Sequence, residues 1–107
     1  MRPLEQKKLL TIITARPFKN MVIEVLRLRG VGGYTVVDAS GAGAFGVQSG
    51  ALEGDSNILV YVILSEARLT GVLEDFDSMM DRSYRLKVIV TDISILPRKK
   101  ASGASTN

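Results

Sequence analysis

The fold is decided by one stretch of the sequence, Ile58-Leu59-Val60-Tyr61-Val62-Ile63-Leu64-Ser65. It holds seven apolar residues in a row and ends at a serine, which is a preferred N-cap residue. This pattern predicts a strand that leads into a helix. A strand with one face in water alternates apolar and polar residues, but this strand does not. Both of its faces are therefore expected to be covered.

Apolar periodicity predicts five more elements on either side of this strand. We expect strands over 9–14, 34–40 and 86–96. A first helix begins at Pro17 and ends at Gly30, and a second helix follows Ser65. The predicted buried faces of the two helices are Phe18, Met21, Val22, Val25 and Leu26, and then Leu69, Val72, Leu73, Phe76, Met79 and Met80.

The resulting order, β-α-β-β-α-β, is typical of the α+β class and of its ferredoxin-like fold. Both helices then cover one face of a four-stranded antiparallel sheet. The other face is apolar and open, so we expect a homo-oligomer packed sheet to sheet. The alternative is that β propensity alone placed Val and Ile there. We expect a single domain over 1–100, with a flexible glycine-rich loop over 41–55 and a mobile polar tail over 101–107.

The composition excludes several kinds of chemistry. The 107 residues include 14 Lys+Arg and 11 Asp+Glu, with no His and no Cys. Zinc sites of the usual kind, haem ligation, iron–sulfur clusters, cysteine nucleophiles and the Ser-His-Asp triad are therefore not expected. The acids Glu24, Asp38 and Asp92 have no obvious partner in the sequence. We expect a cytoplasmic protein that is not an enzyme and holds no metal or prosthetic group.

One glycine-rich motif matches a known nucleotide-binding pattern. Gly41-Ala42-Gly43-Ala44-Phe45-Gly46 matches G-x-G-x-x-G, and Glu66 follows about 20 residues later. More glycine follows this motif, where a dinucleotide-binding domain would begin a helix, so such a domain is not predicted. Two interpretations remain open, a backbone nest for an anion and a flexible hairpin loop. Nucleic acid is not expected, because the two central strands offer only Tyr61 for base stacking.

Three short stretches and one single residue carry a resemblance to a known family. They are Gly33-Tyr34-Thr35-Val36, Gly41-Ala42-Gly43 and Ile63-Leu64-Ser65-Glu66, together with Thr14 at the end of the first predicted strand. With these motifs in this order, the chain resembles the PII-like signalling proteins. The resemblance is to the carbon-metabolism branch, which comprises the SbtB type and the carboxysome-associated PII proteins. It implies a homotrimer with an adenine nucleotide in each cleft between subunits, and a T-loop over 41–55 that engages a partner.

The resemblance also implies which residues bind ligands. The nucleotide-binding residues would be Gly33, Tyr34, Thr35, Val36, Gly41, Ala42 and Gly43, with Tyr84, Arg85, Lys87 and Arg98 from a second subunit. Bicarbonate or another small anion would meet Ser40, Gly41 and Gly43. Ala42, Ala44 and Phe45 stand where many relatives place Lys or Arg, so AMP or ADP is favoured over ATP.

The implied mechanism is linkage, because a ligand that favours one T-loop conformation controls binding of a partner. The resemblance suggests a bicarbonate transporter or another carbon-uptake protein as that partner. The redox-active Cys pair of some SbtB-type relatives is missing. Two alternatives remain open at this stage. One is a small ferredoxin-like enzyme of the α+β-barrel dimer kind, and the other is a trimer of the copper-tolerance CutA family.

Overall fold

The structure, a computed structural model, describes residues 1–40 and 57–98. Its elements are β1 (Glu5–Ala15), the 3-10 turn η1 (Arg16–Phe18), α1 (Lys19–Leu28), β2 (Thr35–Ala39), β3 (Asn57–Leu64), α3 (Glu66–Asp81) and β4 (Leu86–Ile95). The predicted order of strands and helices is confirmed. The loop predicted over 41–55 and the tail predicted over 101–107 lie outside the described residues.

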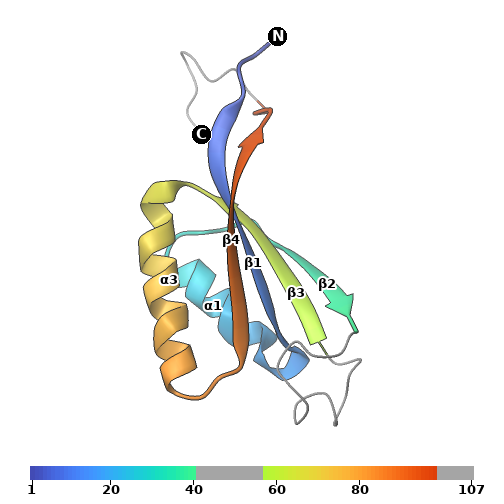
Figure 1. The fold of residues 1–107 in the computed structure, drawn as a ribbon, viewed down its shortest axis with the longest axis vertical. Helices are drawn as coiled ribbons and strands as arrows, with labels where there is room; N and C mark the ends of the chain where they lie inside the picture. Colours follow the sequence, from blue (N-terminus) through green and yellow to red (C-terminus); the bar gives the residue numbers. More distant parts are fainter. Residues whose placement is uncertain (41–56, 99–107) are drawn as a thin grey trace.

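The four strands form one antiparallel sheet in the order β2-β3-β1-β4, with both helices on the same face (Figure 1). The register is fixed by β1, which lies in the middle of the sheet. Thr11 is opposite Tyr61 of β3 on one side and Ile89 of β4 on the other. Tyr61 is in turn opposite Thr35 of β2. The ferredoxin-like prediction is therefore confirmed.

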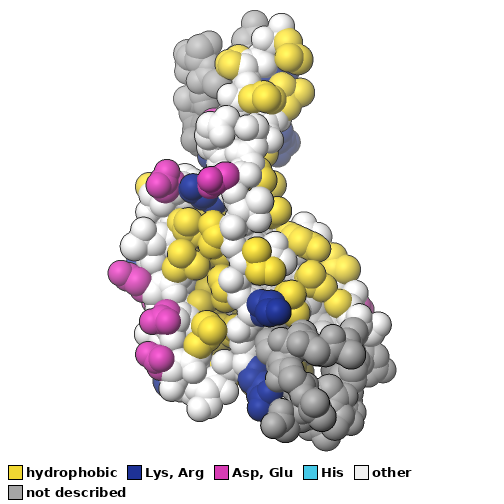
Figure 2. Space-filling view, viewed as in Figure 1, with side chains coloured by type: hydrophobic (Ala, Val, Ile, Leu, Met, Phe, Trp, Pro, Cys, Tyr) yellow, Lys and Arg dark blue, Asp and Glu magenta, His cyan; other side chains and the backbone are white. Residues whose placement is uncertain are grey.

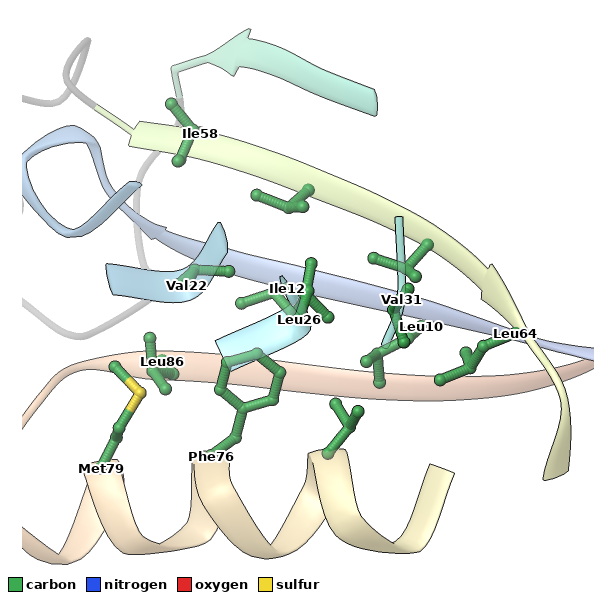
Figure 3. Close-up of a cluster of buried hydrophobic side chains, with 13 residues drawn as sticks. Leu10, Ile12, Val22, Leu26, Val31, Ile58, Leu64, Phe76, Met79 and Leu86 are labelled. Carbon is green, nitrogen blue, oxygen red and sulfur yellow. The ribbon is translucent and has the colours of Figure 1, made fainter. Parts of the chain in front are cut away.

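The hydrophobic core lies between the sheet and the helices, where α1 and α3 bring their apolar faces together (Figure 3). Every second residue of the central strands points into it, as the two-residue period of a strand requires. The core comprises Leu10, Ile12, Val22, Leu26, Val31, Ile58, Val60, Val62, Leu64, Val72, Phe76, Met79 and Leu86. Thr14 is also buried, and its hydroxyl donates a hydrogen bond to the Arg85 carbonyl at 2.8 Å.

The end of α1 and the start of α3 follow the predicted signals, whereas α1 begins at Lys19, two residues after the predicted start at Pro17, which lies in the 3-10 turn η1. Gly30, which follows the C-cap residue Arg29 of α1, has a φ of +79°, and Ser65 caps α3 by accepting a hydrogen bond from the Arg68 backbone N–H at 3.4 Å. The predicted buried faces were too wide. Met21 and Met80 are 37% and 46% exposed, because each lies at the edge of its helix's apolar stripe.

The first strand is longer than the sequence predicted. β1 begins at Glu5, four residues before the predicted start, and continues beyond the end of β3, whose Leu64 is opposite Lys8. Residues 5–7 therefore pair only with residues 93–95 of β4. We name this two-stranded projection the β1–β4 ribbon (Figure 1). Sequence reasoning missed this ribbon because Glu and Lys are less common in strands.

Candidate functional site

The sheet face turned away from the helices is largely apolar. It carries Leu9, Thr11 and Ile13 of β1, Leu59, Tyr61 and Ile63 of β3, Val37 of β2 and Ile89 of β4. Ile63 is 51% exposed, and Val37 and Ile89 are each 42% exposed. Figure 2 shows hydrophobic side chains over this side of the molecule. An apolar surface of this extent on a small domain is typical of an interface with another chain.

One group of the predicted nucleotide-binding residues lies along the β2 edge of the sheet. Gly33 and Tyr34 belong to the connection that enters β2, while Thr35 and Val36 begin the strand. Tyr34 is 44% exposed, whereas Val36 packs against the core. The predicted anion residue Ser40 follows β2 and is exposed. Gly41, Ala42 and Gly43 lie outside the described residues.

A second group lies at the start of β4. Tyr84 packs edge-on against Phe18, with ring centroids 5.2 Å apart, and the Arg82 guanidinium lies 5.8 Å from the Tyr84 ring centre. The next residue, Arg85, is fixed through its carbonyl by the buried Thr14. Lys87 is opposite Ile13 of β1 and is exposed on the apolar sheet face.

These two groups do not meet within one chain. β2 and β4 are the two edges of the sheet, with β3 and β1 between them. Three strand spacings separate them by about 14 Å. Thr35 and Lys87 therefore do not lie side by side within one chain.

Arg98 does not join either group. It follows β4 at the far end of the β1–β4 ribbon, while Arg85 and Lys87 lie at the start of that strand. Ten residues of strand span about 33 Å. The Arg2 side chain donates to the Arg98 carbonyl at 2.7 Å, which holds this backbone beside the N-terminus.

The three acids without an obvious partner in the sequence are all paired in the structure. Asp38 forms an ion pair with Arg16 at 2.7 Å, close to where β2 ends. Hydrogen bonds from Arg27 hold the pKa of Glu24 below its usual value. The hydrogen bond to Asp92 raises the pKa of Lys8. Sequence reasoning missed the pairs of Asp38 and Asp92, because each joins strands or loops that are distant along the chain.

Within residues 1–40 and 57–98 we also looked for a metal site, a membrane-spanning helix and surface grooves. No group of three or more acidic, His or Cys side chains there is placed to hold a metal ion. No helix in these ranges is long and apolar enough to cross a membrane. Two open surface grooves border α3. One lies against β4 and has Leu73, Phe76 and Val88 in its lining, and the other lies against α1.

Comparison with known families decides the class of protein. Residues 7–100 match the family of nitrogen regulatory protein P-II. The chain belongs to the P-II family. P-II proteins are signalling proteins that form trimers and bind adenine nucleotides. The match supports the PII-like prediction over the dimeric enzyme and the CutA-type trimer. No curated protein matches the chain.

Solved structures of P-II-like proteins are similar to nearly the whole chain. One is CPII from Thiomonas intermedia K12, bound to ADP, AMP and bicarbonate, with 30% identity, a TM-score of 0.76 and coverage of 89% of this chain and 92% of that one. CPII bound to ADP and bicarbonate gives 30% identity, a TM-score of 0.75 and coverage of 89% and 93%. A PII-like signalling protein from Thermus thermophilus, at 24% identity, a TM-score of 0.70 and coverage of 87% and 92%, shares the fold.

Proposed function

We propose that this chain is a homotrimeric regulatory protein that binds AMP or ADP between its subunits and responds to bicarbonate. The observation that carries the proposal is the similarity to CPII over nearly the full length of both chains, since CPII was solved with ADP, AMP and bicarbonate. The protein would thereby signal inorganic-carbon status rather than catalyse a reaction.

The position of the predicted binding residues supports a site between copies. Thr35 lies on the β2 edge and Lys87 near the start of β4 on the opposite edge. A ring of three copies, each with its β2 edge facing its neighbour's β4 edge, joins these residues three times. The same arrangement turns the apolar sheet faces inward, where Tyr61 and Ile63 leave water.

The preference for AMP or ADP rests on charge. In the described residues, Arg85 and Lys87 lie at the start of β4, on the edge that would face a nucleotide held by the neighbouring copy. The predicted anion segment adds Ser40 and three residues without cationic side chains, Gly41, Ala42 and Gly43. Each charge-assisted phosphate contact is roughly twice as strong as a neutral one. A site with few cations therefore favours nucleotides with fewer phosphates.

Signalling would pass through segment 41–55, which follows Ser40 directly and lies outside the described residues. Ligand binding would favour one conformation of this segment, and a partner selective for that conformation would then bind more tightly. A bicarbonate transporter or another component of inorganic-carbon uptake fits this role, because it controls the anion that the protein would sense.

Isothermal titration with AMP, ADP, ATP and cyclic AMP, each with and without bicarbonate, tests the proposal. We expect AMP or ADP to bind more tightly than ATP, with an affinity that bicarbonate changes. Lys87→Gln should weaken binding of the favoured nucleotide several-fold. Arg27→Gln is the matched control, since it also removes one exposed positive charge but lies on α1. No binding of any nucleotide would overturn the proposal.

A further inference from the structure

The groove between α3 and β4 lies on the helix side of the sheet and has an apolar floor. Val88 and Val90 occupy alternate positions of β4 with the buried Leu86, so they point toward the helices. From α3 come Phe76, which is 1% exposed, and Met80, which is 46% exposed. Val90 is 41% exposed, so apolar surface remains in water along this groove.

The rim of the groove on α3 is negatively charged. Glu74 and Asp77 belong to its lining, are exposed and lie one turn apart, and Asp81 follows one turn later. In the described part of the chain none of the three forms an ion pair, whereas Asp75 on the other side of α3 is paired with Arg29. The lining includes no Lys or Arg. Figure 2 shows acidic side chains along α3, beside hydrophobic side chains that border β4.

This combination of an apolar floor and an acidic rim restricts the kind of partner. Carboxylates repel the phosphates of nucleic acid and of anionic lipids, so neither suits the groove. A peptide segment that carries Lys or Arg beside apolar residues matches both parts, since charges of opposite sign across an interface select the right partner.

The groove fits a helix better than an added strand. In the proposed trimer the free edge of β4 faces the β2 edge of the neighbouring copy, so its backbone groups do not pair with a strand of another protein. That trimer buries the open face, on the other side of the sheet from the groove. Amphipathic helices bind apolar grooves through side chains alone. Between Thr70 and Met80, α3 spans about 15 Å, the length of about three helical turns.

We infer that the groove between α3 and β4 binds a short basic amphipathic helix of a partner protein. The apolar side of that helix lies over Phe76, Met80 and Val90, and its Lys or Arg side chains pair with Glu74 and Asp77. None of the predicted nucleotide-binding residues lines the groove. The inference therefore goes beyond nucleotide binding, and it rests on the proposed trimer only for the choice of a helix over a strand.

Fluorescence anisotropy with two labelled synthetic peptides tests the charge preference of the full-length protein. The first peptide has about 14 residues, or four helical turns, with Leu at helical spacing and Lys beside it. The second has Glu in place of every Lys. We expect the Lys–Leu peptide to bind at least about tenfold more tightly than the Glu–Leu peptide. Equal affinities, or no binding of the Lys–Leu peptide, would overturn the inference.

Reversing the charge of the rim tests the two carboxylates directly. In the double variant Glu74→Lys with Asp77→Lys we expect the preference to be exchanged, so that the Glu–Leu peptide binds more tightly than the Lys–Leu peptide. A double variant that still prefers the Lys–Leu peptide as strongly as wild type would place the basic residues elsewhere and would contradict the inference.

A matched pair of methionine variants locates the bound peptide. Met80→Lys places a positive charge in the groove, and Met21→Lys makes the same change at a 37% exposed methionine in the other groove, between α1 and α3. We expect Met80→Lys to weaken binding of the Lys–Leu peptide by about tenfold or more and Met21→Lys to leave it unchanged. Equal effects of the two substitutions would overturn the inference.

Sedimentation of the same variants separates a partner site from a contact between copies. We expect Met80→Lys to have the oligomeric state of wild type. A shift of this variant toward monomers would show that a neighbouring copy fills the groove, which would overturn the inference. The proposed function fails separately, since a wild type that binds the Lys–Leu peptide but no nucleotide overturns that function and supports the peptide site.

Discussion

Gly30 is a position outside the core where the backbone conformation favours glycine. Its φ of +79° lies in the left-handed region, and a Cβ there would collide with the guanidinium of Arg68, which donates to the Arg29 carbonyl at 3.0 Å. We expect Gly30→Ala to lower the free energy of unfolding by about 1–2 kcal/mol. Gly32→Ala is the control, because a Cβ at Gly32 meets no atom within 4 Å. Urea denaturation of both variants measures the difference, and equal stabilities would contradict the prediction.

The ion pair between Arg29 and Asp75 gives a prediction about pH. Arg29 donates to both carboxylate oxygens of Asp75, at 2.7 and 2.9 Å, and these hydrogen bonds lower the pKa of Asp75. A lowered pKa means that this stabilisation is present above the pKa of the unfolded chain and is lost as pH falls through that of the folded protein. Asp75→Asn should therefore lower Tm at neutral pH, by roughly a few degrees.

Thermal unfolding of wild type and Asp75→Asn between pH 7 and pH 3 checks the sign. The difference in Tm between wild type and Asp75→Asn should stay constant down to about pH 4 and should disappear below it. A gap that widens as the solution becomes more acidic would contradict the assignment. The matched control is Asp77→Asn on the same helix, which changes a neighbouring carboxylate.

Helix α3 contributes the largest side chain of the core, Phe76, which is 1% exposed. Phe76→Ala removes a buried ring and leaves a cavity, so we expect the free energy of unfolding to fall by about 3–5 kcal/mol. Met80 lies one turn further along α3 and is 46% exposed, so Met80→Ala should cost less than about 1 kcal/mol. Chemical denaturation compares the two, and a Phe76→Ala variant as stable as Met80→Ala would show that the helix does not pack as described.

At the level of elements, the sequence predicted what depends on local apolar patterns. The run from Ile58 to Leu64 and the caps Gly30 and Ser65 predicted both ends of β3, the end of α1 and the start of α3 within a residue or two. The start of β1 at Glu5 was missed, because the partners that hold Glu5 to Lys7 in a strand come from β4, which is distant along the chain. Likewise, the pair of Asp75 with Arg29 depends on how α1 and α3 meet, which no local pattern records.

At the level of the whole molecule, assembly and nucleotide binding should fail together. Ile63→Glu places a charge on the open sheet face, where a neighbouring copy would bury it. We expect the variant to be monomeric and its nucleotide affinity to fall at least roughly tenfold, because the proposed site needs Thr35 of one copy and Lys87 of the next. Light scattering and titration on one sample measure both. Met80→Glu, at a similarly apolar and exposed site on α3, is the control.

A monomeric Ile63→Glu variant that still bound nucleotide with full affinity would place the site within one chain.

The residues predicted for that site show which parts of a site can be predicted from a sequence and which cannot. Resemblance to a family suggested Thr35 and Lys87, but only the strand order shows that they lie on opposite edges of the sheet. The resemblance also suggested Arg98, which the length of β4 separates from Lys87 within one chain.

The central position of β1 has a consequence for how the protein is made. The first of the four strands to leave the ribosome is one that needs partners on both sides, and it pairs with β4, the last of the four. Until Leu86 to Ile95 emerge, one edge of β1 has nothing to bind, so the sheet closes only after β4 has been synthesised. Until then Leu10 and Ile12 lack part of the core that buries them in the folded protein, and exposed apolar surface of this kind promotes aggregation.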